Sequence, residues 1–160
     1  MSDTLLSPAA EAPALLPGQS RYQVTVHNCP HYLDVLSFRA REALSTCWRY
    51  DIQLTCTTPD IACDTFLLKP AAFTFQIPVF TGAPAVPVRT VYGVVQSFRR
   101  LSASADETRY ALRLVPRLAM LQHTKNNAVF LNQSVTEVVE QVLRKHGLAG
   151  PDFEFRLTRA

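Results

Sequence analysis

The sequence predicts a mainly β protein with one α-helix, in which a β-barrel is closed by that helix. Three observations support this prediction. Residues 21–116 are dominated by alternating apolar and polar side chains, which is the period of half-buried strands. Residues 88–101 form a run longer than an ordinary strand, and Gly93 is placed to relieve a bend, as at a barrel corner. Residues 132–147 carry apolar side chains at helical spacing.

The first part of the chain contains three strand-like segments. Residues 22–27 alternate cleanly, residues 28–31 resemble a tight turn, and residues 33–39 are interpreted as the return strand. After a polar connection, residues 48–55 form the clearest amphipathic strand of the sequence. Its apolar face consists of Trp48, Tyr50, Ile52 and Leu54.

A loop at residues 57–64 and a short helix or turn at residues 65–69 lead to the next expected strand, residues 71–80. The apolar phase of that strand is given by Phe73, Phe75 and Ile77. The Pro/Gly-rich residues 81–87 indicate a hairpin loop.

The long strand at residues 88–101 and a strand starting near Tyr110 are joined by the polar turn 102–107. In the second strand the apolar phase is carried by Tyr110, Leu112 and Leu114, and Pro116 ends the strand because it offers no ladder donor. We expect a helical turn at residues 118–121 and a brief strand at residues 128–131, giving six or seven strands in all.

The expected helix begins with a capping box formed by Ser134 and Glu137, and Gly147 can end it. Its apolar stripe contains Val135, Val138, Val139, Val142 and Leu143. Because β-branched valines lower helix propensity, packing of this stripe must stabilise the helix. The stripe is interpreted as core or subunit interface. Residues 153–157 alternate again and predict a further strand.

The chain therefore divides into a flexible N-terminal arm (residues 1–20), a barrel (residues 21–121) and a helix-containing extension (residues 122–160). The extension is expected to be the start of a further subdomain. The chain ends almost as soon as its last expected strand does, so we expect it to be truncated.

The composition fits one globular domain and excludes several classes of protein. Among 160 residues, 48% are hydrophobic and 18% charged, and the net charge of +3 is too small to predict a nucleic-acid partner. Of 16 basic residues 13 are arginine, which suits interfaces or merely reflects a GC-rich genome. Neither a transmembrane run nor a signal peptide is recognisable.

No catalytic motif is found, so neither an enzyme nor a cofactor is expected. A metal site at His27, Cys29 and His31 is less favoured than a plain turn with exposed imidazoles. No disulfide framework is expected, and Cys47 and Cys56 are expected to pack as small apolar residues.

Three further sets of residues are also interpreted as structural rather than as catalytic or ligand-binding. Acidic residues of the expected loops are interpreted as solvated rather than as a catalytic pair; they are Asp60, Asp64, Asp106 and Glu107. Trp48 is interpreted as a core residue rather than a ligand anchor. Several arginines are interpreted as a solvated or interface-lining outer face rather than a phosphate site; they are Arg99, Arg100, Arg113 and Arg117.

The chain also carries an ordered series of short patterns. The first consists of Val35, Phe38, Glu42, Leu44 and Ser45. The second consists of Arg89, Gly93 and Val95. The third consists of Tyr110, Leu112, Leu114, Pro116, Leu118 and Leu121. The last consists of Phe130, Ser134, Val135, Glu137, Val138 and Val139. In this order and spacing, residues 21–157 resemble the N-terminal hub region of the VgrG spike proteins of type VI secretion, relatives of phage tail hub (late control gene D) proteins.

The resemblance implies a phage tail-hub-like barrel with a structural role. Its fold markers are Gly93, Tyr110, Leu114, Pro116, Leu121, Ser134 and Glu137. The family commonly has a glycine where Leu68 or Lys69 stands here, and its members are normally several times longer. Family members act as trimeric hubs that sit on the inner tube and carry a puncturing needle and effectors.

The resemblance also implies partners. They are a homotrimer, the hexameric inner-tube protein (haemolysin-coregulated protein), baseplate proteins, and effectors and a PAAR-type tip bound through a C-terminal region beyond this chain, with no nucleic acid. The residues expected at an interface are Arg109, Arg113 and Arg117. Assembly is expected in the cytoplasm, followed by export through the type VI machine without a signal peptide. The alternative interpretation is a standalone small β-barrel that binds a ligand in its mouth, and an enzyme with dispersed residues ranks last.

Overall fold

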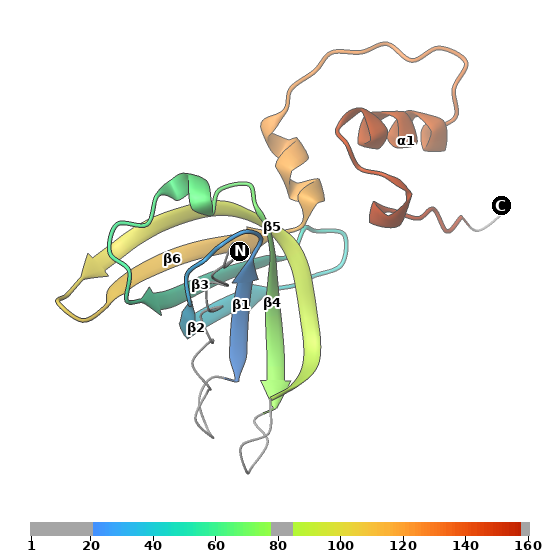
Figure 1. Cartoon of the computed structure of the whole chain (residues 1–160). Coiled ribbons are helices and arrows are strands. Elements are labelled where there is room, and N and C mark those ends of the chain that lie inside the picture. The colour runs from blue at the N-terminus through green and yellow to red at the C-terminus, as the bar shows by residue number, and fades with distance from the viewer. Residues whose placement is uncertain (1–20, 78–84, 158–160) are drawn as a thin grey trace, which may run out of the picture.

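A computed structural model describes residues 21–77 and 85–157 (Figure 1). Its described strands form a single six-stranded antiparallel sheet with the order β1-β4-β5-β6-β3-β2. The strands are β1 (Tyr22–Val26), β2 (Asp34–Arg41), β3 (Arg49–Cys56), β4 (Pro70–Ile77), β5 (Val86–Ala103) and β6 (Thr108–Val115). Together with the helix α1 (Val135–Lys145), this sheet confirms the mainly β fold class. The expected arm at residues 1–20 lies outside the described residues.

The sheet curls into a half-barrel because β5 changes its partner halfway along. Its first half pairs with β4, where Val86 lies opposite Ile77 and Val94 opposite Pro70. Its second half pairs with β6, from Val94 opposite Val115 to Ala103 opposite Thr108. The sheet therefore has two leaves, β1-β4 and β6-β3-β2, joined through one continuous bent strand (Figure 1).

The inner faces of the two leaves meet in an aromatic core. Phe73 of β4 lies with its ring centroid 5.4 Å from Tyr50 of β3 and 4.9 Å from Phe38 of β2. Phe73 and Tyr50 are both at most 1% exposed. Aromatic pairs at these separations stabilise a core beyond their buried area. The alternation expected for residues 48–55 places Ile52 and Leu54 in the same core.

The strands β1 and β2 close the half-barrel through side chains and not through a ladder. Tyr22 of β1 packs edge-on against Phe38 of β2, with ring centroids 4.8 Å apart. The interpretation of residues 33–39 as the return strand of β1 is wrong, because β1 pairs with β4 and β2 pairs with β3. The turn is present, with the Cys29 amide donating to the Val26 carbonyl over 3.1 Å, but the chain beyond it crosses to the other leaf.

A second aromatic stack lies under the loop between β3 and β4. The rings of Phe66, Phe98 and Tyr110 lie parallel, with centroids 4.1 Å apart for the first pair and 5.0 Å for the second. The Tyr110 hydroxyl accepts from the Ile61 amide at 3.3 Å and donates to the Thr58 carbonyl at 3.1 Å. Tyr110 thereby ties the loop to β6.

Gly93 lies next to the point where β5 changes partner. A Cβ at this residue would lie 2.3 Å from the Val115 carbonyl oxygen and 2.6 Å from Cη2 of Trp48. Contacts that short are not tolerated, so the close passage of β5 over Val115 and Trp48 requires a residue without a side chain.

Irregularities in β4 and at its start change the expected faces. A register shift between Phe75 and Gln76 turns Gln76 inward and leaves Ile77 59% exposed, so the expected shared face of Phe73, Phe75 and Ile77 is wrong at its last member. Leu68, just before β4, has a φ of 62°. This left-handed conformation is unusual for leucine and favours glycine.

After β6, Pro116 precedes the 3-10 helix Arg117–His123. An extended segment then leads to α1, which lies beyond one end of the sheet (Figure 1). The Ser134 side chain accepts from the Glu137 amide, and the Glu137 carboxylate accepts from the Ser134 amide at 2.7 Å. Both halves of the expected capping box are therefore present.

The C-terminus of α1 is closed by a Schellman motif. The Leu148 amide donates to the Leu143 carbonyl and the Gly147 amide to the Arg144 carbonyl, each over 3.0 Å, while Gly147 has a φ of 76°. Leu143 and Leu148 are buried together. In the rest of the valine stripe, Val138 and Val142 are half-buried, whereas Val135 and Val139 are exposed, Val135 to 81%.

Two expected strands and one expected core residue are wrong. Residues 128–131 and 153–157 run without pairing to any described strand, and Val129 and Leu131 are largely exposed. Short alternating stretches predict a strand only where a neighbouring strand is available to pair with them. Cys47 is exposed, whereas Cys56 is buried as expected.

Substitution Gly93→Ala should destabilise the fold by about 3 kcal/mol, because the new methyl group collides with a backbone carbonyl that cannot move without breaking β6. Urea unfolding followed by circular dichroism measures this. Gly150→Ala is the matched control, since a Cβ there meets no atom within 4 Å. Equal unfolding midpoints for the two variants would contradict the assigned close approach.

Substitution Leu68→Gly should raise the free energy of unfolding by up to about 1 kcal/mol, because it relieves a left-handed backbone at the loss of a mostly exposed side chain. The same urea experiment measures it. Leu36→Gly is the control: that leucine is comparably exposed but has no positive φ, so its replacement should destabilise. Destabilisation by both changes would refute the strain at Leu68.

Candidate assembly surface

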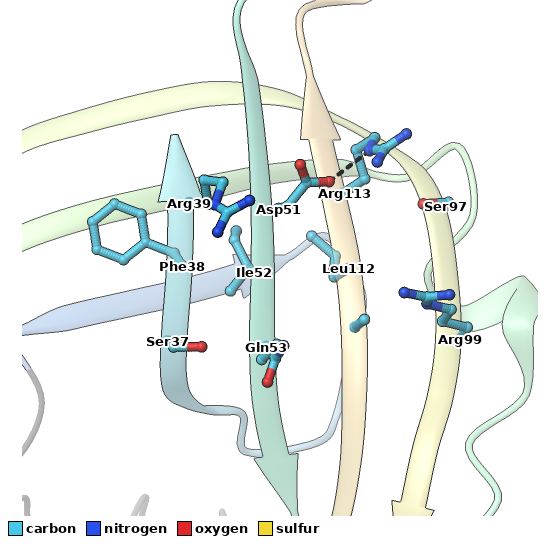
Figure 2. Close-up of a pocket in the computed structure, with 11 residues that line it drawn as sticks. Ser37, Phe38, Arg39, Asp51, Ile52, Gln53, Ser97, Arg99, Leu112 and Arg113 are labelled. Atoms are coloured by element: carbon cyan, nitrogen blue, oxygen red, sulfur yellow. Dashed lines mark hydrogen bonds and ion pairs between the residues drawn. The ribbon is translucent and has the colours of Figure 1, made fainter. Parts of the chain in front are cut away.

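The outer face of the larger leaf carries polar side chains in two rows that cross four strands. Pairing between strands places Arg39 opposite Asp51, Asp51 opposite Arg113, and Arg113 opposite Ser97. The adjacent row consists of Ser37, Gln53, Ala111 and Arg99. These residues line a depression of about 660 Å³ on the outside of the sheet (Figure 2).

Asp51 is the single carboxylate among those lining residues, and it contacts two arginines. The Arg113 Nε donates to one of its oxygens over 2.7 Å, and the Arg49 Nε lies 3.1 Å from the other. Asp51 therefore holds both guanidinium groups against β3. Because all three side chains are more than one third exposed, these pairs contribute little to stability.

The three arginines expected at an interface do not share one location. Arg109 and Arg113 lie four residues apart on the outer face of β6, where Arg109 pairs with Glu107 over 3.4 Å. Arg117 lies beyond the sheet and contacts the C-terminal segment. It reaches Asp152 over 3.4 Å and donates to the Gly147 carbonyl over 3.1 Å. Arg117 thus links the end of β6 to the segment that follows α1.

A separate polar cluster joins two of the short sequence patterns. Glu42, just after β2, accepts a hydrogen bond from the Tyr50 hydroxyl. Its two carboxylate oxygens also accept from Nη2 of Arg89, over 2.7 Å and 2.9 Å. Glu42 and Arg89 are 47 residues apart, so the cluster fastens the β2–β3 connection to the start of β5. Sequence reasoning did not single these residues out as a site; their places in two patterns were the available signal.

The cluster shifts the pKa of its members. The hydrogen bond from Tyr50, followed by that from Arg89, lowers the pKa of the Glu42 carboxyl. Burial of the ring and the bond to Glu42 raise the pKa of the Tyr50 hydroxyl to about 12. Both shifts favour a charged Glu42 beside a neutral Tyr50 at neutral pH.

The described residues include no cluster of side chains suited to a metal ion. No three of their His, Cys, Asp and Glu side chains gather closely enough for a metal ion. Of the loop acids, Asp60 pairs with Arg100 and Glu107 pairs with Arg109. Within the same part of the chain, no helix is both long and apolar enough to cross a membrane.

The Glu42 cluster should make stability dependent on pH on the acid side. Because the pKa of Glu42 is lower when folded, its contribution is complete above the ordinary pKa near 4.5 and is lost as pH falls through the folded value. Glu42→Gln should therefore lose less stability than the wild type between about pH 7 and about pH 3 in urea unfolding. Glu154→Gln, in an exposed pair with Arg156, is the matched control and should follow the wild type. An unchanged pH dependence in Glu42→Gln would exclude this role.

Comparison with known proteins gives consistent results. The family model of the phage tail baseplate hub (GPD) matches residues 41–160. The type VI secretion system spike protein VgrG5 of Pseudomonas aeruginosa is 32% identical over 139 residues, which are 87% of this chain and 16% of VgrG5. Spike protein VgrG4b of the same organism is 28% identical over the same length, again 87% of this chain and 16% of the relative. The chain thus spans about a sixth of these relatives.

A solved structure shows the same fold. The Escherichia coli c3393 protein, described as a component of the type VI secretion system with structural similarity to T4 bacteriophage tail proteins gp27 and gp5, aligns with a TM-score of 0.66. It is 36% identical, and the alignment covers 77% of this chain and 32% of c3393. With its bent half-barrel and capped helix, the chain belongs to the phage tail baseplate hub family, alongside the VgrG spike proteins of type VI secretion.

Proposed function

We propose that the chain is a structural part of a type VI secretion spike and forms its hub. The observation that carries this proposal is the hub-family match over residues 41–160 on a sheet of the corresponding fold. The role is mechanical: the bent sheet is a rigid block whose surfaces hold other subunits. The Vibrio cholerae relative named actin cross-linking toxin VgrG1 matches over 12% of its own length, so its activity is not transferred to this chain.

In this proposal three copies form a hub that sits on the hexameric inner tube made of haemolysin-coregulated protein. Baseplate proteins would surround it, and a needle, effectors and a PAAR-type tip would be carried by regions beyond this chain. The assembly would form in the cytoplasm and leave through the type VI machine. Exposed Arg109 and half-buried Arg113 on β6 are proposed as contact residues, with Arg117 holding the C-terminal segment in place.

The alternative of a standalone ligand-binding barrel is less well supported. Its ligand would need an apolar cavity between the two leaves, but that space is filled by side chains. Tyr50, Phe73 and Leu54 are each at most 1% exposed and pack there against one another. The mechanical role is therefore favoured over small-molecule binding.

The assembly can be tested by light scattering coupled to size-exclusion chromatography. The chain, mixed with the inner-tube protein of the same organism, is expected to elute as three copies per tube hexamer. Arg109→Glu combined with Arg113→Glu should reduce the complex severalfold, because both changes reverse charge on one outer face. The double variant Arg21→Glu, Lys125→Glu is the matched control, and circular dichroism checks folding. A folded chain that stays monomeric and does not bind the inner-tube protein would refute the hub proposal.

A further inference from the structure

The outer face of the larger leaf holds more positive charge than its own residues balance. Four arginines, Arg39, Arg49, Arg99 and Arg113, surround the single carboxylate of Asp51. We call these five residues the arginine face. Neighbouring strands lie about 4.8 Å apart, so the guanidinium groups repel one another across the sheet. An anion bound among them would remove this repulsion.

The side chains of two of these arginines make no ion pair or hydrogen bond with the described residues. Arg39 and Arg99 are exposed and lie on opposite sides of the Asp51–Arg113 pair (Figure 2). Arg49 and Arg113 contact Asp51 through Nε. Their terminal nitrogens make no hydrogen bond with Asp51, so they remain available as donors. The face therefore presents several forked donors to whatever lies above it.

The shape of the face suits an inserted side chain. Ala111 lies between Gln53 and Arg99 in the cross-strand row, and it lines the depression with a small side chain. Ser37 and Ser97 add uncharged hydroxyl groups at the margins. The depression is thus lined by arginines from β2, β5 and β6, which lie on different sides of it (Figure 2).

We propose that the arginine face binds a carboxylate-bearing segment of a partner protein, with Arg39 and Arg99 as its main donors. The proposal names the chemistry of one hub partner and so rests on the proposed function. Planar guanidinium forks match carboxylates in bidentate pairs, whereas lysines, which are absent from this face, act as point charges.

A nucleic-acid partner is disfavoured by the position of the aromatic residues. Sheets that bind single-stranded nucleic acid stack bases on exposed aromatic side chains. The aromatic residue that lines this depression, Phe38, instead packs into the core against Tyr22 and Phe73 at 4.8 Å and 4.9 Å. The face thus offers charge and hydrogen bonds without a stacking surface.

The test is fluorescence anisotropy with the whole chain and a labelled oligoglutamate peptide at low salt. Wild type should bind the peptide, and Arg39→Glu combined with Arg99→Glu should weaken binding at least about tenfold. Arg39→Lys with Arg99→Lys keeps the charge but removes the forks, so its affinity should fall between the two. The matched control Arg21→Glu, Lys125→Glu should bind as wild type. Circular dichroism confirms that each variant is folded.

Three results would overturn the proposal. They are an absence of peptide binding by wild type, equal losses in the control and the arginine-face variant, and tighter binding of a single-stranded oligonucleotide of the same charge. Each leaves the hub proposal standing if the chain still assembles on the inner tube. Conversely, peptide binding that depends on Arg39 and Arg99 in a chain that does not assemble would remove the hub role but keep the site.

Discussion

The structure depends on one strand serving two leaves. β5 pairs with β4 along its first half and with β6 along its second, so the sheet can close on its own core only if this strand bends where the partners change. Gly93 permits the bend by leaving space for the Val115 carbonyl and the Trp48 ring. The aromatic contacts between Phe73 and Tyr50 then follow from the angle between the leaves.

The same curvature separates the two kinds of surface. Alternation along β3 turns Tyr50, Ile52 and Leu54 inward and Asp51 outward, so a filled interior and a charged exterior come from one strand. Since the interior has no room for a ligand, recognition is left to the outside. The proposed role as a structural hub and the proposed carboxylate partner both rely on this division.

The local features were largely predictable from sequence. Alternation located the strands of the sheet, although it also predicted two that do not form. Ser134, Glu137 and Gly147 marked both ends of the helix, because these signals lie within a few residues of the structure they produce. Strand partners were not predictable in the same way. β1 pairs with β4 across the chain, and nothing local to residues 22–39 distinguishes that from a hairpin.

The same limit applies to the surface. Arg109 and Arg113 were found because they flank a recognisable apolar phase on one strand. Asp51 and Arg39 can be assigned to the same surface as Arg113 only from the register between strands, which brings together residues far apart in the chain. Arg117 is expected at an interface with the other arginines, yet Pro116 ends the strand before it and its side chain lies 3.4 Å from Asp152.

The sheet order also sets the sequence of events during synthesis. β3 lies between β2 and β6, and its residue Asp51 pairs with Arg113, whose codon is read 62 positions later. Synthesis adds roughly 5–20 residues per second, so β6, the second neighbour of β3, is completed several seconds after β3. During that interval the edge of β3 that pairs with β6 in the folded sheet has no partner strand. While it waits, the unpaired strand can pair with a wrong partner. A protein whose strands all pair with their neighbours in sequence has a shorter interval of this kind.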